Sequence, residues 1–330
     1  MPPSEKKILF LTTLPPDEIE AEWHRDQSWS LPHALRELGA SVSIQCWQDK
    51  TLDMKKLTEF DVITFLWCYG YDRYPIEFPE FVKRKLLPAQ NLRPALKVLN
   101  HSSVVLWNTD KAQYLKDLHD AGFLVPKYDS VLDCSTFSSA ETLAQHISTL
   151  AGRITNGSVV LKPSISASSK QTHLIKDSSK MTERDLKFID EVILSGIHGS
   201  LIIQAFEPAI ANGEYSLVFI AGRHTHTMVK VPAKGDFRSQ EEFGGHIEEL
   251  TLDRVPEQAK ETAEKIMRFL DSKVGDVTYC RLDGVLRNTG DFVVMEVEVI
   301  EPELWVETCR DSSIRETLCR ALLGTIIDST

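Results

Sequence analysis

Residues 279–286 read Tyr-Cys-Arg-Leu-Asp-Gly-Val-Leu, and residues 294–302 read Val-Met-Glu-Val-Glu-Val-Ile-Glu-Pro. Both stretches alternate apolar and polar residues, which is typical of half-buried β-strands. The pattern predicts strands over 277–286 and 292–300, joined by a turn at 287–291. The two strands are therefore expected to pair as a hairpin.

Side chains two positions apart in a strand share a face of the sheet. Arg281 and Asp283 therefore share one face of the first strand, and Glu296 and Glu298 share one face of the second. With a hairpin loop of two or four residues, Asp283 lies opposite Glu296 and Arg281 lies opposite Glu298. The pairing predicts that three carboxylates converge on one patch.

Carboxylates that converge repel one another unless a cation lies among them. Oxygen ligands without histidine favour Mg²⁺ over zinc, so Asp283, Glu296 and Glu298 are candidate magnesium ligands. The alternative is a solvated polar face of an amphipathic hairpin, with a cross-strand Arg–Glu pair that adds little stability. Spacing alone leaves both interpretations open.

Lys162 lies at the C-terminal end of the apolar strand Val159–Lys162 and precedes the serine-rich loop 164–172. Its ammonium, the backbone N–H groups and the hydroxyls of the loop are suited to holding phosphate. The candidate phosphate ligands are Lys162, Ser164, Ser166 and Ser168. The loop has no glycine and is not a Walker loop, so a merely solvated loop is the alternative.

Two further segments carry polar groups beside strand ends. Gln204-Ala-Phe-Glu207 ends a strand at 201–206, where backbone groups can meet an adenine edge and carboxylates a ribose, or where the chain is only a linker. The long irregular segment 232–245 follows Lys230 and contains Arg238 and Gln240. Long structureless segments are often functional, although an ordinary basic loop would look the same.

The first third of the chain predicts a small α/β domain. Strands at 7–12 and 41–47 flank a helix at 29–38, and apolar runs at 62–67 and 104–107 predict two more strands. No G-x-G-x-x-G follows the first strand, which argues against a dinucleotide site there. We expect a doubly wound domain at 1–107, a central α+β unit at 108–206 and a last unit at 207–330.

Composition and charge exclude several classes of function. The 330 residues are 42% hydrophobic and 26% charged, as in globular proteins, and 48 acidic against 37 basic residues leave a net charge of −11. That charge gives no general attraction to nucleic acid or to anionic membranes. Six cysteines without a C-x-x-C pair are expected to be reduced, and the N-terminus lacks a signal-peptide pattern, which predicts a cytoplasmic protein.

Taken together, the motifs resemble those of ATP-grasp ligases, and among them the glutathione-synthetase-like branch. They occur in order between about residues 107 and 302: Lys111, Leu161-Lys162-Pro163, Gln204-x-Phe206, Gly213-Glu214-x-Ser216, Lys230 to Arg238-x-Gln240, Gly244-Gly245, Arg281-x-Asp283-Gly and Glu296-x-Glu298-x-x-Glu301-Pro302. The N-terminal third is similar to that of D-cycloserine-forming cyclo-ligases. The resemblance implies an ATP-grasp fold behind a pre-ATP-grasp domain.

The resemblance also implies roles for individual residues. Lys111 and Lys162 would hold ATP phosphates, Gln204, Ala205 and Phe206 would meet adenine, and Glu207 or Glu214 would meet ribose. Asp283, Glu296 and Glu298 would bind Mg²⁺. Lys230 and Arg238 would be catalytic, while Arg238, Gln240, Gly244, Gly245 and Arg281 would contact the substrate or its phosphorylated form.

The activity that the resemblance implies is ADP-forming ligation of a carboxylate to an amine through an acyl phosphate. The carboxylate would belong to an amino acid or a small peptide-like molecule, and ring closure within one substrate is a variant. A nucleotide-binding regulatory module and a kinase-like phosphotransferase are the alternatives. The general base for the amine and a homo-oligomeric state are left open.

Two departures from the family pattern bear on these expectations. The loop after Lys162 is serine-rich where relatives are glycine-rich, which affects how it would close over phosphates. Leu66 stands where the cyclo-ligases tend to place an arginine. The acceptor substrate is therefore expected to differ from theirs.

Overall fold

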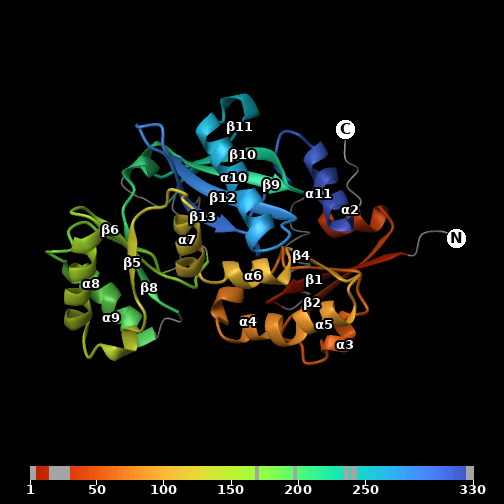
Figure 1. Cartoon of the computed structure of the whole chain (residues 1–330), viewed down its shortest axis with the longest axis horizontal. Helices are drawn as coiled ribbons and strands as arrows, with labels where there is room; N and C mark the ends of the chain where they lie inside the picture. Colours follow the sequence, from red (N-terminus) through yellow and green to blue (C-terminus); the bar gives the residue numbers. More distant parts are fainter. Residues whose placement is uncertain are drawn as a thin grey trace.

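The computed structural model describes residues 5–14, 30–167, 171–195, 199–233, 238 and 244–324. Its strands form three sheets, each with its own covering helices (Figure 1). In Figure 1 the first sheet lies at the lower right, the second at the left and the third at the top, so the three parts surround a common centre.

The first sheet is parallel, in the order β2-β1-β3-β4. Alternate residues of β1 face opposite cores: Ile8 and Phe10 pack toward α2, whereas Leu9 and Leu11 pack toward α4 and α5. Both faces are covered, as expected of a doubly wound domain. The elements are β1 (Lys6–Thr12), α2 (Leu31–Glu37), β2 (Ala40–Cys46), α3 (Met54–Leu57), β3 (Val62–Thr64), a 3₁₀ turn (Tyr71–Arg73), α4 (Glu77–Phe81), a π-helical turn (Val82–Leu86), α5 (Leu87–Leu92), β4 (Lys97–Leu99) and α6 (Ser102–Asn108).

Two strand predictions in this domain need correction. The run 104–107 is part of helix α6, and the fourth strand is β4, which lies just before it. His101 begins α6 by accepting a hydrogen bond from the backbone N–H of Ser103. A four-residue apolar run is equally compatible with a buried helix, so periodicity could not decide. The third strand also ends at Thr64, earlier than predicted, where its short partner β4 ends.

The second sheet has the order β5-β8-β6-β7, with every pair antiparallel. Apolar residues of α8 and α9 pack against one of its faces. The chain reaches this sheet through α7 (Lys111–Asp120), which Asp110 caps. The other elements are β5 (Tyr128–Val131), a 3₁₀ turn (Cys134–Thr136), α8 (Ala140–Ile154), β6 (Val159–Pro163), β7 (His173–Ile175), α9 (Glu183–Ser195) and β8 (Leu201–Ala205).

The third sheet has the order β11-β10-β9-β12-β13, again antiparallel throughout. Helix α10 covers one face with Ala263, Ile266 and Leu270, against Leu217 and Leu282 of the sheet. The opposite face carries Val218 and Ile220, which pack in a core with residues of α11, and also the polar residues Ser216 and Asp283. The elements are a 3₁₀ turn (Pro208–Asn212), β9 (Glu214–Ile220), β10 (Arg223–Val231), β11 (His246–Leu250), a 3₁₀ turn (Leu252–Arg254), α10 (Glu257–Lys273), β12 (Tyr279–Leu286), β13 (Phe292–Glu298) and α11 (Ser313–Leu323).

The β12–β13 hairpin has the predicted pairing but not the assumed loop length. Arg281 pairs with Glu298 and Asp283 pairs with Glu296. The connection is five residues long, 287–291, and a bulge beside Asp283 and Gly284 leaves Met295 unmatched. The extra residue in β13 offsets the odd loop length, so the three carboxylates still share a face.

Helix α11 returns the end of the described chain to the first domain, where it packs beside α2 (Figure 1). All six cysteines lie in the described ranges, and none is in a disulfide, as expected. Within those ranges, no helix combines the length and apolar character needed to cross a lipid bilayer.

Candidate active site

One face of the third sheet gathers the charged residues. Because α10 covers the apolar face, alternation along each strand turns the polar side chains to the other side. The register then aligns them across four strands: Lys230 lies opposite Glu214, Ser216 opposite Asp283, and Asp283 opposite Glu296. Of these, Lys230, Glu214, Asp283 and Glu296 line one cleft of about 830 Å³, and Ser216 is buried beneath it.

Lys230 lies at the centre of this face. Its ammonium is 3.0 Å from a carboxylate oxygen of Glu214 and 3.3 Å from one of Asp283. Burial lowers its pKa, but Asp283 and Glu214 together hold the pKa of Lys230 above its ordinary value. Lys230 therefore stays charged inside the cleft.

Arg281 bridges two of the three clustered carboxylates. Its Nε is 3.1 Å from both oxygens of Asp283, and its Nη2 is 2.6 Å from Glu298. Its guanidinium also lies over the ring of Trp305, 5.3 Å from the centroid. Arg281 was predicted to bind a substrate carboxylate. To do so, its guanidinium would have to give up one of these partners for the substrate.

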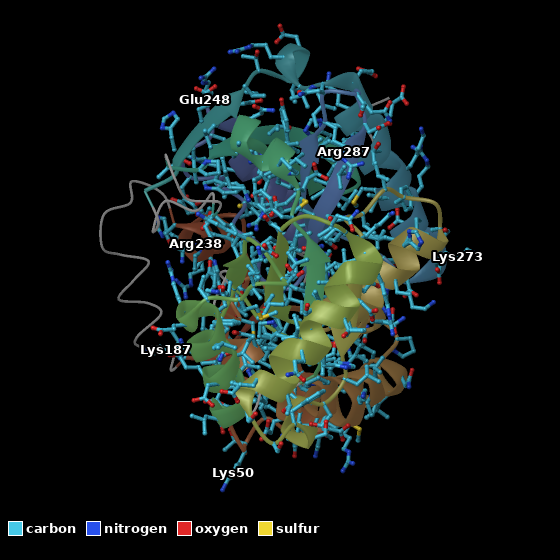
Figure 2. All side chains as sticks on the ribbon, turned by 90° about the vertical axis from the view of Figure 1, so that its left-hand side faces the viewer. Lys50, Lys187, Arg238, Glu248, Lys273 and Arg287 are labelled. Carbon is cyan, nitrogen blue, oxygen red and sulfur yellow. The ribbon has the colours of Figure 1, made fainter. Side chains whose placement is uncertain are left out.

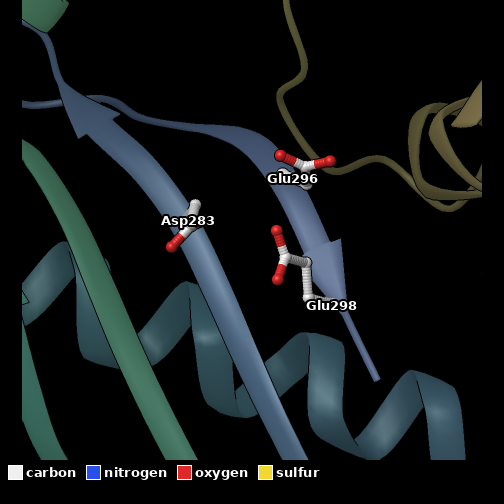
Figure 3. Close-up of side chains that lie close together, drawn as sticks. All are labelled: Asp283, Glu296 and Glu298. Atoms are coloured by element: carbon white, nitrogen blue, oxygen red, sulfur yellow. The ribbon is translucent and has the colours of Figure 1, made fainter. Parts of the chain in front are cut away.

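Asp283 comes from β12, while Glu296 and Glu298 come from the neighbouring β13 (Figure 3). One oxygen from each of the three lies within 4.8 Å of the others. Opposite ligands of Mg²⁺ are about 4.2 Å apart, since each Mg–O distance is roughly 2.1 Å. The set therefore fits a magnesium ion after a small contraction.

Electrostatics separates the three carboxyl groups. Burial opposes ionisation of Asp283, but Arg281 and Lys230 lower its pKa to about 2. Burial likewise opposes ionisation of Glu296, whose pKa Lys111 and Lys162 nevertheless lower. Burial raises the pKa of Glu298 to about 7, against the opposing effect of Arg281. A bound divalent cation would favour the ionised form of all three.

Two lysines reach the cleft from the central sheet and the helix before it. Lys111, at the start of α7, is 3.1 Å from Glu296 and also donates to the carbonyl of Ser166. Lys162 makes no ion pair with any residue that the structure describes, and burial lowers its pKa. An ammonium in a cleft without a carboxylate partner fits an anionic ligand such as a phosphate.

The cleft continues between the central and third sheets as an apolar slot. Val160, Ile210 and Met295 line it together with Phe206 and Gln204. Val160 pairs with Gln204 across β6 and β8, and it shares a strand face with Lys162. Gln204 is only 2% exposed, and its amide nitrogen has no hydrogen-bond partner among the residues that the structure describes. A flat ligand with polar edges, such as a nucleobase, would satisfy that nitrogen.

Glu207 follows this slot and is fixed by an arginine from the β12–β13 loop. Arg287 binds one oxygen of Glu207 through Nη2 at 2.6 Å and Nε at 3.0 Å. Glu207 is 7% exposed. Figure 2 shows Arg287 in the upper part of the molecule and Arg238 at its edge, between the levels of Glu248 and Lys187.

Most of the predicted site residues line this one cleft. They are Lys111, Lys162, Ser166, Gln204, Ala205, Phe206, Glu207, Glu214, Lys230, Arg238, Arg281, Asp283, Glu296 and Glu298. Ser164 does not line it, because its buried hydroxyl accepts a hydrogen bond from the N–H of Ser200. Gly244 and Gly245 lie outside the lining, before β11. Ser168 and Gln240 lie outside the described residues.

Sequence reasoning gave no site role to several residues that line the cleft, among them Val160, Glu301 and Trp305. Val160 could have been predicted, because strand alternation places it on the same face as Lys162. Trp305 and Glu301 belong to a segment without regular structure, for which no period exists. His224, His226 and His246 do not line the cleft, and His226 is buried with Nε2 2.7 Å from the carbonyl of Leu304.

The three sheets around a cleft of cations and carboxylates define an ATP-grasp fold. Residues 132–302 match the family model of the ATP-grasp domain of prokaryotic glutathione synthetase. The match covers just over half of the 330 residues, and the chain belongs to this family. It is an ATP-dependent ligase.

Solved structures share the fold over nearly the whole chain. D-cycloserine synthetase is 21% identical with a TM-score of 0.70, covering 96% of this chain and 98% of its own. The D-alanine–D-alanine ligase of Bacillus anthracis, complexed with ATP, is 13% identical with a TM-score of 0.66, covering 97% and 96%. The ATP-grasp ligase PsnB, complexed with a precursor variant, Mg and ADP, is 15% identical with a TM-score of 0.57, covering 97% and 99%. No curated protein sequence matches significantly.

Proposed function

We propose that the protein is an ADP-forming carboxylate–amine ligase that acts through an acyl phosphate. Its substrate would be an amino acid or a small peptide-like molecule. The observation that carries the proposal is the convergence of Asp283, Glu296 and Glu298 with Lys111, Lys162, Lys230 and Arg238 on one cleft. Such a set matches the triphosphate of ATP and the cation that accompanies it.

The chemistry explains why the site needs no nucleophilic side chain. A carboxylate oxygen of the substrate attacks the γ-phosphorus of ATP, and the bond to the β–γ bridging oxygen breaks to release ADP. The amine nitrogen then attacks the acyl carbon, the carbon–oxygen bond to phosphate breaks, and the nitrogen loses a proton. The products are an amide, ADP and inorganic phosphate.

Each charged residue has a position suited to one step of this reaction. Lys162, which forms no ion pair with a described residue, would hold the phosphates, and Lys230 and Arg238 would stabilise charge on the transferred group and on the tetrahedral oxyanion. Mg²⁺ held by the three carboxylates would neutralise triphosphate charge and orient the phosphates. Lys111 would exchange its pair with Glu296 for a phosphate oxygen.

Isotope transfer gives a direct test of the acyl phosphate. The full-length protein would be incubated with Mg-ATP and a pool of amino acids. One sample would contain the unlabelled pool, and a second would contain the same pool labelled with ¹⁸O in the carboxylates. We expect ADP and phosphate in equal amounts, with one ¹⁸O atom in the phosphate, because the carboxylate oxygen leaves with it. Label in AMP, or phosphate without label, contradicts the proposed route.

The same assay separates the alternatives. Ring closure within one substrate releases ADP and labelled phosphate with a product lighter than its precursor by one water. ADP without free phosphate indicates a phosphotransferase, and ATP binding without turnover on any pool indicates a regulatory module. Either of these last two results overturns the proposed ligase activity.

A further inference from the structure

On the outer edge of β13, side chains take the place of a neighbouring strand. β13 is the last strand of the third sheet, so the backbone groups on this edge need partners from elsewhere. The carbonyl groups of Val297 and Val299 and the N–H of Val299 bond to two side chains of the first domain, Asn100 and Asn108. Because Glu298 lies between the two valines, the first domain holds the chain directly beside a candidate metal ligand.

Asn108 bonds to the backbone on both sides of Glu298. Its Nδ2 donates to the carbonyl oxygen of Val297 at 2.7 Å, and its Oδ1 accepts from the N–H of Val299 at 3.2 Å. That carbonyl and that N–H belong to the two peptide groups that flank the Cα of Glu298. Since each peptide group is planar and turns only about φ and ψ, fixing both groups fixes the direction in which the Glu298 side chain leaves the backbone.

Helix α6, which ends at Asn108, packs in two hydrophobic cores. Val104 packs in the core between α10 and the third sheet, and the next residue, Val105, packs in a core on one face of the first sheet. Nε1 of Trp107 also donates to Asp117 of α7 at 2.9 Å, which joins α6 to the following helix. Asn108 itself is 6% exposed. It therefore projects from an element that two cores and a neighbouring helix hold in place, as precise positioning requires.

The same stretch of chain reaches the other carboxylate of β13. Lys111, three residues after Asn108, lies 3.1 Å from Glu296. An ammonium can exchange a carboxylate for a phosphate oxygen when a nucleotide binds, but the neutral amide of Asn108 has no charge that attracts an anion. We therefore expect the contact between Asn108 and the backbone around Glu298 to persist when the nucleotide binds.

We propose that Asn108 is a positioning residue that holds Glu298 in the geometry that Mg²⁺ requires. Mg²⁺ demands near-ideal octahedral geometry with Mg–O distances of about 2.1 Å, whereas Ca²⁺ accepts roughly six to eight oxygens in a flexible arrangement. A carboxylate that is held in one direction therefore favours Mg²⁺ over Ca²⁺, and a loosened carboxylate loses that preference. Asn108 acts on the choice of cation through the backbone of Glu298 and does not touch the cation.

That a divalent cation binds here together with the nucleotide rests on the proposed function, but cation binding can be measured without turnover. The full-length protein is titrated with a non-hydrolysable ATP analogue at increasing Mg²⁺ or Ca²⁺. Calorimetry then gives the cation concentration at which half of the gain in affinity is reached. For Asn108→Ala, we expect this concentration to rise at least tenfold for Mg²⁺ and less than threefold for Ca²⁺. Affinity for the analogue in EDTA should stay within twofold of the wild type.

Ser103→Ala is the matched control, because Ser103 also lies in α6 but donates to the carbonyl of Val274, at the end of α10. It removes a bond that holds the helix and should leave both cation concentrations within twofold. Glu298→Gln removes a ligand and should raise both at least tenfold. If Asn108→Ala fails to fold, Asn108→Ser provides the test, since its hydroxyl can keep one of the two bonds. It should raise the Mg²⁺ concentration at least threefold and leave that for Ca²⁺ within twofold.

Several results would overturn the proposal. Equal rises for Mg²⁺ and Ca²⁺ in the Asn108 variant would, because a generally loosened hairpin weakens both, and so would an unchanged Mg²⁺ dependence or the same shift in Ser103→Ala. Lower affinity in EDTA would assign Asn108 to nucleotide contact, and failure of both Asn108 variants to fold would assign it to folding alone.

The wild type separates this inference from the proposed function. Analogue binding that does not respond to Mg²⁺ would remove both the metal part of the proposed function and this inference. An Mg²⁺ response that Asn108→Ala leaves intact would remove the inference alone. The expected loss of Mg²⁺ preference in Asn108→Ala, without ligation of any substrate pair by the wild type, would leave the inference standing and remove the proposed function.

Discussion

Asp283 links three other side chains of the site. It accepts a hydrogen bond from Ser216 at 2.5 Å, and it forms ion pairs with Lys230 at 3.3 Å and with Arg281 at 3.0 Å. A buried carboxylate with these partners stays ionised, which is why its pKa is about 2 although burial opposes ionisation. Without this carboxylate, Lys230 would keep Glu214 and Arg281 would keep Glu298 as ion-pair partners among the described residues.

Asp283→Asn should therefore destabilise the protein. Removing one charge from a buried network typically costs about 3–5 kcal/mol, since each of its partners loses a counter-charge. Ser216→Ala is the matched control, because it removes only one hydrogen bond and should cost about 1 kcal/mol. Urea unfolding measures both, and equal losses in the two variants would contradict the electrostatic explanation.

We expect Lys162 to contribute to ATP binding and Arg238 to contribute to catalysis. Lys162→Ala is expected to weaken binding of an ATP analogue at least tenfold, because this ammonium has no other partner among the described residues. Arg238→Ala should leave that affinity within twofold and abolish product formation. Calorimetry and an ADP-release assay check both, and equal loss of affinity in the two variants would refute the division.

Among the elements, the β12–β13 hairpin determines where the metal carboxylates lie. Its pairing followed from strand alternation, because a one-residue shift would turn Arg281 or Glu298 to the opposite face. The bulge at Met295 could not be predicted, since no local residue pattern required it. Helix α6 was missed for a related reason, as a short apolar run has no period to measure. Strands β5, β7 and β11 were not predicted, and each has only three to five residues.

Gly284 is tightly enclosed within this hairpin. A Cβ there would lie 2.3 Å from the ring of Phe292 and 2.8 Å from the carbonyl oxygen of Val293. Gly284→Ala should therefore lower the free energy of unfolding by about 1–3 kcal/mol, as overpacking does. Gly152→Ala in α8 meets nothing within 4 Å and should raise stability by about 0.5–1 kcal/mol. A neutral Gly284→Ala would show that the hairpin adjusts freely.

The β9–β10 hairpin should make stability depend on pH. His224 is half-buried beside Thr227, and burial lowers its pKa to about 4. The unfolded chain binds a proton below about pH 6.5, whereas the folded protein does not until about pH 4. The contribution of His224 to the free energy of unfolding is thus fully present above pH 6.5. It is lost as the pH drops toward 4, and the loss is no more than about 3 kcal/mol. His224→Gln should reduce this slope in urea unfolding, and an unchanged slope would contradict the assignment.

At the scale of the whole molecule, the cleft exists only where three sheets meet. Helix α7 brings Lys111 to Glu296, and Asn108 donates to the carbonyl of Val297, so the central unit and the first domain hold β13 in place. The motifs indicated which residues belong together because they resemble those of a known family. Glu301 and Pro302 belong to the motif that carries the resemblance, but the place of segment 300–308 in the cleft lining could not be predicted, since it follows from how the domains pack and not from a local pattern.

The most direct test of the shared cleft is the Mg²⁺ dependence of nucleotide binding. The affinity of a non-hydrolysable ATP analogue would be measured by calorimetry, with and without Mg²⁺, for the wild type, Glu296→Gln and Glu298→Gln. We expect Mg²⁺ to tighten binding to the wild type strongly and each substitution to reduce that gain at least tenfold. The same gain in all three proteins would show that the carboxylates and the nucleotide do not share a site.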